Sequence, residues 1–504
     1  TKEYIKYQMG DGVDRKCNMY SPSPETVRAY LRDYDTVPVS REILSDVRTP
    51  IEVLSALLAV DDHCFILESI EDRKRWGRYT IIGFQPAMDL TCTDGNMEIR
   101  ENGSVRTVET DRPSDVIREV LSKHRSPVME GMPPFTGGLV GYFSYDYIKY
   151  AEPTLRIDSK DDEGFKDADL MLFDKVIVFD NFHQRITVIA HANSARSYDE
   201  ACDEIDRIIG IIKNGKQREH VPAVLKSDFR AMHSAKRYCE MVEKGKERIR
   251  EGDIFQVVLS NRLDADFEGS LLDVYRVLRT TNPSPYMFYF SGTDIEVAGA
   301  SPETLVKLKD GILHTFPLAG TRPRGADDEE DRRLEEELLS DEKERAEHNM
   351  LVDLGRNDLG RVSEIGSVEV EKYMEIERFS HVMHIGSTVS GRIAEGRDAM
   401  DAIEAVLPAG TLSGAPKLMA CRIIDELEDC KRGIYGGAIG YIDLAGNMDV
   451  CIGIRLAYRK NGKVFVRSGA GIVADSIPEN EYSECINKAK AVVEAIQRAS
   501  EGLE

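Results

Sequence analysis

The sequence predicts an α+β fold in which antiparallel sheets carry helices on their outer side. Two observations lead to this prediction. In the second half of the chain, β-type runs follow one another through hairpin turns rather than through crossover helices. In the first half, short β-type runs separated by turns begin with CFILESI (64–70). A doubly wound parallel sheet would instead alternate each strand with a helix.

The N-terminal half mixes helices with short strands. A proline-rich opening leads into residues 22–60, which we predict to be helical. Short β-type runs separated by turns predict strands at 64–70, 78–84, 89–93 and 97–102, and two β-branched runs around a polar turn predict a hairpin over 174–192. A polar cap predicts a helix at 114–124, and amphipathic spacing predicts a helix at 197–215. The polar stretch 213–228 is the predicted linker. We therefore expect an N-terminal region, 1–225, and a second region, 226–504.

The second half begins with a predicted helix, 234–253, and strand, 254–267. Further strands are predicted within 286–292, 304–320, 436–444 and 450–471. One short internal similarity links the halves: GGLVGYFSYD (137–146) resembles GGAIGYIDLA (436–445). Two equivalent strands in two related sheets would explain it, since glycines in a strand let another backbone approach closely.

Composition excludes several classes of partner. The formal net charge is −23, which argues against nucleic acid or an anionic membrane, so an anionic substrate would need local cations. The longest apolar runs are too short to span a bilayer, and the first residues lack the apolar core of a signal peptide. The nine cysteines form no C-x-x-C pair, which favours reduced thiols in the cytoplasm over a zinc cluster.

Two glutamate pairs with the same spacing lie far apart in the chain: Glu344 with Glu347, and Glu481 with Glu484. Helical residues at i and i+3 share a face, so each pair can direct two carboxylates at one point. If the points coincide, four acids need a cation, and oxygen-only ligands favour Mg²⁺. The alternative is a solvated, salt-bridged surface, because 89 of the 504 residues are acidic.

Two glycine-containing segments can receive an anion. In GTLSGAPK (410–417), a turn feeds a helix with exposed N–H groups, and Lys417 follows. In RSGAG (467–471), Gly469 and Gly471 flank Ala470 after a strand, so backbone N–H groups can converge on an oxyanion. The alternative in both cases is an ordinary glycine turn.

Arg455 is the third candidate, because it lies in the apolar run VCIGIRLAY (450–458), where an unpaired guanidinium is costly. It should meet a carboxylate, from a protein glutamate or from a ligand. His381 and His384 lie on opposite faces of a predicted strand, so at most one faces a given site. These groups together suit a small ligand with more than one carboxylate, oriented by Mg²⁺.

Several segments within 230–497 resemble the chorismate-utilising enzyme family, in the family's order. They are PLAGTRPRG (317–325), ERAEHNMLVDLGRNDLGR (344–361), FSHVMHIGS (379–387), GTLSGAPK (410–417), YGGAIGYI (435–442), IGIRLA (452–457) and SGAGIVADS (468–476). The resemblance implies two antiparallel sheets packed face to face with helices outside, and a cleft that binds chorismate with Mg²⁺. Glu347 and Glu484 match the metal ligands, and Glu344 and Glu481 match partners that reach the ion through water.

The resemblance also implies which residues bind the substrate. The ring carboxylate is expected at Thr411 and the Gly469–Gly471 segment, and the enolpyruvyl carboxylate at Tyr435 and Arg455, where a bidentate guanidinium suits a planar anion. The full expected set is Gln256, Gly320, Thr321, Thr411, Lys417, Tyr435, Arg455, Gly469, Ala470 and Gly471.

The implied reaction has two steps. Ammonia adds at C2 of chorismate as the C4 hydroxyl leaves, and loss of pyruvate then gives anthranilate, the first step of tryptophan biosynthesis. Glu303 matches the acid that helps the hydroxyl depart, a role that requires a raised pKa. His384 matches the histidine of the elimination step, whereas His381 is interpreted as structural.

Two positions choose among the family's activities. Relatives that add water carry a lysine at Gln256, and an amide is a poor base. Relatives that use a covalent nucleophile carry a lysine at Ala319. Both positions favour direct amination. The alternatives are an enzyme that stops at 2-amino-2-deoxyisochorismate and a catalytically silent binding protein on the same scaffold.

The N-terminal region resembles the family's regulatory region, which implies feedback inhibition by tryptophan. The expected inhibitor-binding residues are Glu68, Ser69, Pro285, Tyr286, Met287, Ile439 and Tyr441. None of the cysteines has the Gly-x-Cys-x-Gly context of a glutaminase nucleophile. A separate glutamine amidotransferase subunit is therefore expected to supply ammonia.

Overall fold

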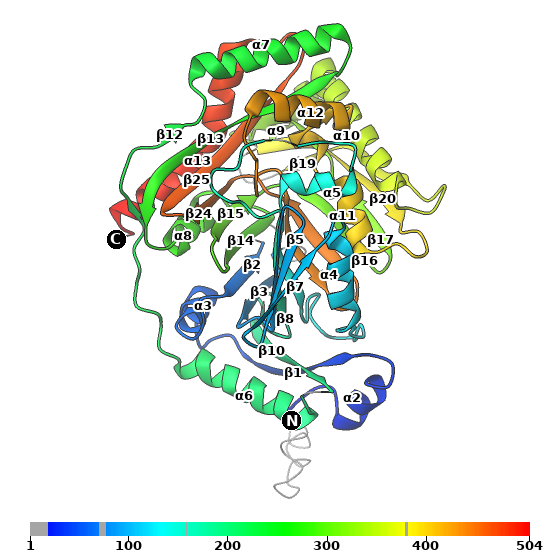
Figure 1. Cartoon of the computed structure of the whole chain (residues 1–504), viewed down its shortest axis with the longest axis vertical. Coiled ribbons are helices and arrows are strands. Elements are labelled where there is room, and N and C mark those ends of the chain that lie inside the picture. Colours follow the sequence, from blue (N-terminus) through cyan, green and yellow to red (C-terminus); the bar gives the residue numbers. More distant parts are fainter. Residues whose placement is uncertain (1–18, 70–76, 158, 195, 379–381, 504) are drawn as a thin grey trace, which may run out of the picture.

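A computed structural model describes residues 19–69, 77–157, 159–194, 196–378 and 382–503. Within these residues, the strands form a thirteen-stranded and a twelve-stranded sheet, with helices around them (Figure 1). Neighbouring strands run antiparallel in both sheets, for example β13 with β25 and β22 with β7. The α+β prediction is therefore confirmed.

The first sheet contains, in spatial order, β1 (Thr36–Leu44), β10 (Arg185–Asn193), β9 (Lys175–Asp180), β3 (Tyr79–Phe84), β2 (Cys64–Glu68), β14 (Tyr286–Ser291), β15 (Glu296–Ser301), β24 (Leu456–Lys460), β25 (Lys463–Ile472), β13 (Gln256–Glu268) and β11 (Val224–Leu225). Two short strands, β12 (Arg230–Ala231) and β21 (Gly414–Ala415), also pair with β13.

The second sheet contains, in spatial order, β18 (Leu318–Pro323), β20 (Val382–Arg392), β17 (Ile312–Thr315), β16 (Thr304–Lys309), β23 (Met448–Ile452), β22 (Ala438–Asp443), β7 (Gly138–Phe143), β8 (Ala168–Phe173), β4 (Met88–Thr93), β5 (Asn96–Glu101) and β6 (Ser104–Glu109), with β19 (Glu369–Arg378) beside β20.

The helices lie around these sheets (Figure 1). They are α2 (Pro24–Tyr30), α3 (Pro50–Leu58), α4 (Pro113–Ser122), η1 (Tyr145–Tyr147), α5 (Ile148–Ala151), α6 (Tyr198–Asn214), α7 (Ala235–Glu251), α8 (Leu272–Thr281), α9 (Asp328–Ser340), α10 (Glu342–Gly360), α11 (Ala399–Val406), η2 (Gly410–Leu412), α12 (Lys417–Glu428) and α13 (Pro478–Glu501). Within the described residues, none of them combines the length and the apolar character needed to traverse a lipid bilayer.

The two sheets pack face to face through an apolar layer to which both contribute. Phe65, Phe288 and Phe465 come from the first sheet, and Val140 and Ile439 come from the second. Separate apolar clusters lie between the outer faces of the sheets and the helices. Alternation of side chains along each strand produces this layering, because successive residues point to opposite faces.

Both sheets combine strands from the two predicted regions. In the first sheet, β2 pairs with β14, and in the second, β7 pairs with β22. We expected the two glycine-rich motifs to occupy two related sheets, and this expectation is wrong. They lie side by side in one sheet, with Gly141 opposite Gly440. A Cβ at Gly141 would lie 2.0 Å from the Asp169 carbonyl oxygen, and one at Gly440 would lie 2.1 Å from that of Asp449. Each glycine thus lets a neighbouring strand approach closely.

The helix predicted over 22–60 is wrong in its middle. Thr36–Leu44 form β1, which pairs with β10 over its whole length, while only α2 and α3 are helical. The prediction failed because β1 is an edge strand whose partner lies about 150 residues later in the chain. The hairpin at 174–192 and the helix ended by Asn-Gly are confirmed as β9–β10 and α6.

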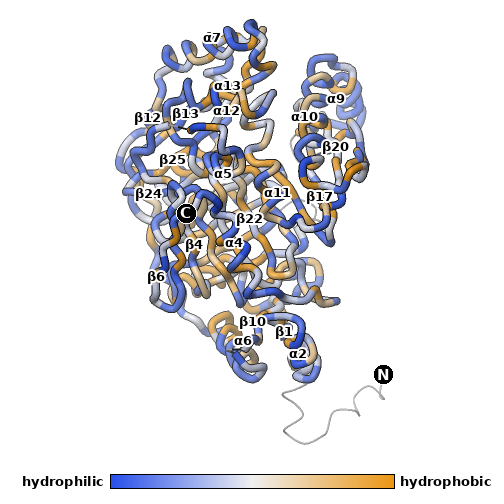
Figure 2. The backbone as a smooth tube through the Cα atoms, turned by 45° about the vertical axis from the view of Figure 1, so that its right-hand side comes forward, coloured by the Kyte–Doolittle hydropathy of each residue, from blue (hydrophilic) through white to orange (hydrophobic). Residues whose placement is uncertain are grey.

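Helices α10 and α13 belong to different parts of the fold. Figure 2 shows α9, α10 and β20 as a body beside α7, α12 and α13. A cleft of about 1120 Å³ lies here, lined by α10 on one side and by α13, β13 and β25 on the other.

Candidate active site

The cleft brings together most of the residues that the sequence singled out. Those that line it are Gln256, Glu303, Gly320, Thr321, Glu344, Glu347, Thr411, Tyr435, Arg455, Gly469, Gly471, Glu481 and Glu484. They come from segments more than two hundred residues apart, so only the tertiary fold assembles them.

The two glutamate pairs face the cleft from opposite walls, with Glu344 and Glu347 on α10 and Glu481 and Glu484 on α13. Burial, together with the charges of Glu344 and Glu484, raises the pKa of Glu347. Burial and the charge of Glu484 also raise the pKa of Glu481. The helical i,i+3 prediction is thus confirmed for both pairs, and carboxylates on opposite walls repel one another.

These carboxylates suit a divalent cation in chemistry. Within the described residues, no three acidic, histidine or cysteine side chains are close enough together to hold a metal ion. The Glu484 carboxylate instead forms an ion pair with Lys488, with Oε1 2.7 Å from Nζ. The four carboxylates nevertheless line one cleft and repel one another, and oxygen ligands are the kind that Mg²⁺ prefers.

Glu303 lies beside Thr411, whose hydroxyl donates to Glu303 Oε1 at 3.2 Å. Burial raises the pKa of Glu303 to about 7, although the Thr411 hydrogen bond and the charge of Lys488 oppose the shift. The carboxyl is therefore partly protonated near neutral pH, as a general acid must be. The raised pKa expected from the resemblance is confirmed.

His384, on β20, does not itself line the cleft but contacts two residues that do, Gly320 and Thr321. Its Nδ1 is 2.8 Å from the Gly320 carbonyl oxygen and 3.1 Å from the Thr321 hydroxyl. Since a carbonyl only accepts, Nδ1 carries the proton and Nε2 carries the lone pair of the neutral ring. Burial lowers the pKa of His384, so the ring is a neutral base at pH 7. His381 lies outside the described residues.

Gly469, Ala470 and Gly471 do not form the turn that we expected. They are the last part of strand β25 and pair with β13, so they alternate between its two faces. Gly469 and Gly471 line the cleft, whereas the Ala470 side chain is buried in an apolar cluster on the other side. The segment can thus offer a flat, side-chain-free floor, and only the backbone of Ala470 remains available to a ligand.

The two floor glycines should differ in their tolerance of a methyl group. A Cβ at Gly469 would lie 2.6 Å from the Leu259 carbonyl oxygen and 3.0 Å from the Tyr435 hydroxyl, whereas one at Gly471 would meet the Gln256 amide nitrogen at 2.6 Å. Backbone cannot move aside as a side-chain amide can. We expect Gly469→Ala to cost about 1–3 kcal/mol of stability and most of the activity, and Gly471→Ala to cost less. Thermal melts with turnover assays check this; equal effects would contradict it.

Arg455 is not inside a strand, contrary to the prediction. It lies between β23 and β24 with a left-handed backbone (φ 54°), a conformation that a non-glycine residue rarely adopts. Its guanidinium lines the cleft and donates to the Lys488 carbonyl oxygen at 3.0 Å. Among the described residues, Arg455 forms no ion pair with a glutamate and is exposed, so the ligand alternative stays a prediction.

Lys417 does not reach the cleft. Its ammonium group forms an ion pair with Asp358 at 2.7 Å and donates to the Val406 carbonyl oxygen at 2.9 Å. The expected substrate contact at Lys417 is therefore wrong, and the side chain instead ties α12 to α10. The sequence could not show this because Asp358 lies 59 positions away.

Three cations that line the cleft escaped the sequence analysis: Lys343, Arg467 and Lys488. Lys488 follows Glu484 by one helical turn, a Glu-to-Lys i,i+4 spacing that could have revealed it. With Arg455, they provide the local positive charge that a dianionic substrate needs in an acidic protein.

The residues predicted to bind an inhibitor lie apart from the cleft, but on two faces of the first sheet. Tyr286, Ile439 and Tyr441 belong to the apolar layer between the two sheets, whereas Glu68 and Met287 face α8 on the outer side. Glu68 on β2 pairs in register with Met287 on β14. Its carboxylate is already occupied by Arg279, through Nη2 at 3.0 Å and through Nε, and by the Tyr275 hydroxyl at 2.5 Å. An amino group could reach Glu68 only in competition with Arg279.

The other predicted inhibitor residues surround this position. The Tyr286 hydroxyl is 2.8 Å from both Thr304 Oγ1 and Asp449 Oδ1, and Asp449 is the register partner of Tyr441. Ile439 is buried, and Pro285 is half-buried beside Tyr286. The Ser69 hydroxyl is buried and has no hydrogen-bond partner among the described residues. An unsatisfied buried hydroxyl of this kind is a typical ligand contact.

Comparisons with known proteins identify the family of this chain. A model of the chorismate binding enzyme family matches residues 62–494. The chain is 45% identical to "Anthranilate synthase component 1" of Acetivibrio thermocellus, over 96% of this chain and 100% of that protein, and 45% identical to the protein of the same name from Aquifex aeolicus, over 96% and 99%.

Among solved structures, anthranilate synthase component I from Streptococcus pneumoniae is similar, with 41% identity and a TM-score of 0.75. The alignment covers 90% of this chain and 99% of that chain. A family match over most of the chain, joined to full-length relatives and a shared fold, leads to one conclusion: the chain belongs to the chorismate-binding enzyme family.

Proposed function

We propose that this protein is the large subunit of an anthranilate synthase, which aminates chorismate at C2 with ammonia and eliminates pyruvate. The single observation that carries the proposal is the cleft itself, which unites Glu303, Arg455 and both glutamate pairs, with a neutral His384 behind its lining residue Gly320. The full-length similarity to proteins named anthranilate synthase component 1 supports the same activity.

Each cleft residue has a role that follows from its chemistry. Thr411 and the floor at Gly469 and Gly471 receive the ring carboxylate, and Tyr435 with Arg455 binds the enolpyruvyl carboxylate. Glu303 donates a proton to the departing C4 hydroxyl. Nε2 of His384 takes the C2 proton in the elimination, because Nδ1 is held by the Gly320 carbonyl.

Mg²⁺ is the proposed cofactor, with Glu347 and Glu484 as ligands and Glu344 and Glu481 as partners that act through water. The ion would neutralise the negative charges of the acidic walls and of the substrate carboxylate. Positioning of the substrate carboxylates still depends on the chain's own cations and hydroxyl groups.

Gln256 is the proposed selector of ammonia over water, because its amide is no base. Ala319, the other selector, lies in β18 between Leu318 and Gly320, which both line the cleft. We expect Gln256→Lys to produce a trace of isochorismate from water. Chromatography of the products after incubation without ammonium checks this. Absence of isochorismate would show that this position does not select the nucleophile.

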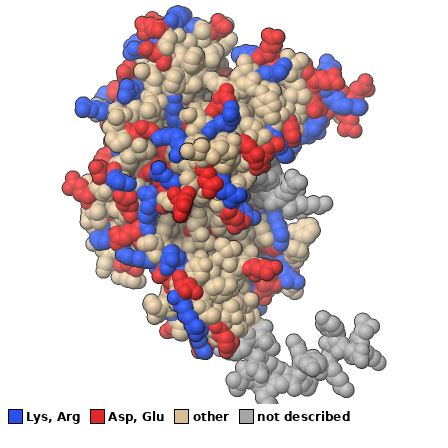
Figure 3. Space-filling view, turned by 90° about the vertical axis from the view of Figure 1, so that its right-hand side faces the viewer, with Lys and Arg blue, Asp and Glu red and all other residues tan. Residues whose placement is uncertain are grey.

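Ammonia is proposed to come from a separate glutamine amidotransferase subunit, as the word "component" in the relatives' names implies for them. Every cysteine of the described residues is a free thiol, and most of these are buried. This supports a reducing compartment, and we propose the cytoplasm. Acidic and basic side chains are interspersed on the face in Figure 3, with no basic stripe for nucleic acid or an anionic membrane.

Tryptophan is the proposed feedback inhibitor, bound around the β2–β14 pair at Glu68, Ser69, Pro285, Tyr286, Met287, Ile439 and Tyr441. Ser69→Phe should fill the space around the unsatisfied hydroxyl and relieve inhibition, with turnover nearly unchanged. Turnover against tryptophan concentration checks this, with Ser122→Phe on the exposed end of α4 as the matched control. If Ser69→Phe keeps the wild-type sensitivity to tryptophan, the inhibitor does not bind at Ser69.

The proposal is tested by incubating the protein with chorismate, ammonium and Mg²⁺ while following anthranilate fluorescence and pyruvate. The expected result is equal amounts of both products, abolished by a chelator. Consumption of chorismate without fluorescence would support the alternative enzyme, which stops at 2-amino-2-deoxyisochorismate. The neutral His384 behind the cleft lining disfavours that outcome.

A further inference from the structure

A buried ionic triad lies beneath the cleft and has no part in the chemistry described above. The Glu428 carboxylate, at the end of α12, accepts from Arg432 Nε at 2.9 Å and Nη2 at 2.6 Å, and from Arg467 Nη2 at 2.5 Å. The backbone N–H and hydroxyl of Ser260 also donate to it, at 2.6 and 2.9 Å. All three charged side chains are at most 1% exposed.

Burying three charges is expensive, and apolar residues of similar volume would often stabilise a fold as well or better. Stability alone is therefore a weak reason for this triad. Two arginines and one glutamate also leave a net positive charge under a cleft that is proposed to bind a dianion. A specific function has to be sought in what the triad touches.

Arg432 touches three separate parts of the cleft. Its Nη1 donates to the Leu412 carbonyl oxygen at 2.6 Å, directly after Thr411, and its Nη2 donates to the Val258 carbonyl oxygen at 2.7 Å. Its guanidinium lies 5.8 Å from the centre of the Tyr435 ring. Leu412, Val258 and Tyr435 all line the cleft.

Arg467 continues the connection into the floor. It lies on β25 two residues before Gly469 and itself lines the cleft. Its Nε donates to the Ser260 hydroxyl at 2.8 Å, and Ser260 is the register partner of Gly469. One carboxylate thus fixes two guanidinium groups that together contact η2, β13, β25 and Tyr435.

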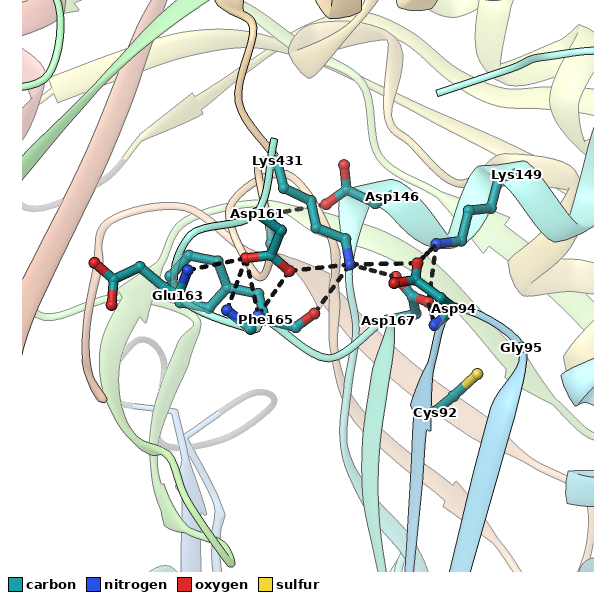
Figure 4. A network of polar contacts seen from close by, with 12 residues as sticks. Cys92, Asp94, Gly95, Asp146, Lys149, Asp161, Glu163, Phe165, Asp167 and Lys431 are labelled. Carbon is teal, nitrogen blue, oxygen red and sulfur yellow. Dashed lines mark hydrogen bonds and ion pairs between the residues drawn. The ribbon is translucent and has the colours of Figure 1, made fainter. Parts of the chain in front are cut away.

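The residue next to Arg432 provides a contrast. The Lys431 side chain is 6% exposed and turns to a different ion network, with Asp167 at 3.2 Å, Asp161 at 3.3 Å and the Phe165 carbonyl oxygen at 3.1 Å (Figure 4). Among the described residues, the partners of its ammonium group are Asp94, Asp161, Asp167 and Phe165, none of which lines the cleft. Two adjacent buried cations therefore serve two different regions.

We propose that Arg432, held by the Glu428 carboxylate that Ser260 in turn anchors, is a positioning residue for substrate. It sets the spacing between the Thr411 segment, the β13–β25 floor and Tyr435, which hold the two carboxylates of chorismate. The identity of the ligand rests on the proposed function, whereas the positioning of these three elements rests on the contacts alone. A lysine at 432 keeps the charge but cannot reproduce the planar fork that reaches a carboxylate and two carbonyls together.

The test compares Arg432→Lys and Ser260→Ala with Lys431→Met in the full chain. Equilibrium binding of chorismate without ammonium, steady-state kinetics and thermal melts are measured for each. We expect Arg432→Lys to raise the Kd and KM for chorismate about tenfold or more, and Ser260→Ala to raise them several-fold, because small misplacements of binding groups are costly. The KM for ammonium should stay within about twofold in both.

Lys431→Met should lower the melting temperature yet leave the Kd and KM for chorismate within about twofold. The proposal is overturned if Arg432→Lys and Ser260→Ala change chorismate affinity no more than Lys431→Met does. If Arg432→Lys does not fold, Ser260→Ala decides between these outcomes. A wild-type protein that binds chorismate but forms no anthranilate would refute the proposed function, and the binding comparison would still test the role of Arg432.

Discussion

Glu347→Gln and Glu484→Gln should each lower anthranilate formation about 10³-fold, the largest effect that we expect from any single substitution. The two residues line the same cleft from α10 and α13, and the charge of Glu484 contributes to the raised pKa of Glu347. An amide keeps the shape of the side chain but removes the negative charge that attracts Mg²⁺. Steady-state kinetics over a range of Mg²⁺ concentrations measures the effect.

Glu344→Gln and Glu481→Gln are the matched controls, since they lie one helical turn away on the same two walls. Removing a group that acts on a metal through water typically lowers metal affinity or activity about 10- to 100-fold. Excess Mg²⁺ should partly restore the activity of Glu344→Gln and Glu481→Gln. It should restore much less of the activity of Glu347→Gln and Glu484→Gln. Equal losses at all four positions would contradict the assignment of direct and water-mediated roles.

Glu303→Gln should lower kcat about 10²- to 10⁴-fold and change the pH dependence of the reaction. A general acid works only when protonated, and burial raises the pKa of Glu303 to about 7. The wild-type rate should therefore be high below pH 7 and fall as the pH rises through about 7. Glutamine does not titrate, so the variant should lose this alkaline limb. Profiles of kcat against pH from 5.5 to 9 would show it.

Thr411→Val provides a companion to this test. The Thr411 hydroxyl donates to Glu303, and this hydrogen bond opposes the rise in pKa. Its removal should move the alkaline limb to higher pH while leaving the limb in place. An alkaline limb that persists unchanged in Glu303→Gln would mean that another group supplies the proton.

The sequence was informative where the chemistry depends on local spacing. The i,i+3 interval placed Glu344 with Glu347 and Glu481 with Glu484 on helix faces that the structure brings to one cleft. Short β-type runs with hairpin turns were enough to predict antiparallel sheets, since a hairpin needs only local turn signals. The resemblance then supplied roles that spacing alone leaves open.

The sequence failed where a contact joins distant segments. Lys417 is bound to Asp358, and Glu68 to Arg279, 211 positions away, so neither is available in the way that we expected. Arg455 looked like a strand residue because the apolar run around it continues on both sides, yet a left-handed residue separates β23 from β24. The paired glycine motifs could not be placed in one sheet from sequence, because register between distant strands leaves no local pattern.

The central claim is that one magnesium ion makes the two acidic walls compatible with an anionic substrate. The most direct test measures the Kd of chorismate by calorimetry with and without Mg²⁺, in the absence of ammonium. Binding linkage is reciprocal, so Mg²⁺ should tighten chorismate binding about 10-fold or more, and chorismate should tighten Mg²⁺ binding by the same factor. Equal chorismate affinity with Mg²⁺ and with a chelator would contradict the account.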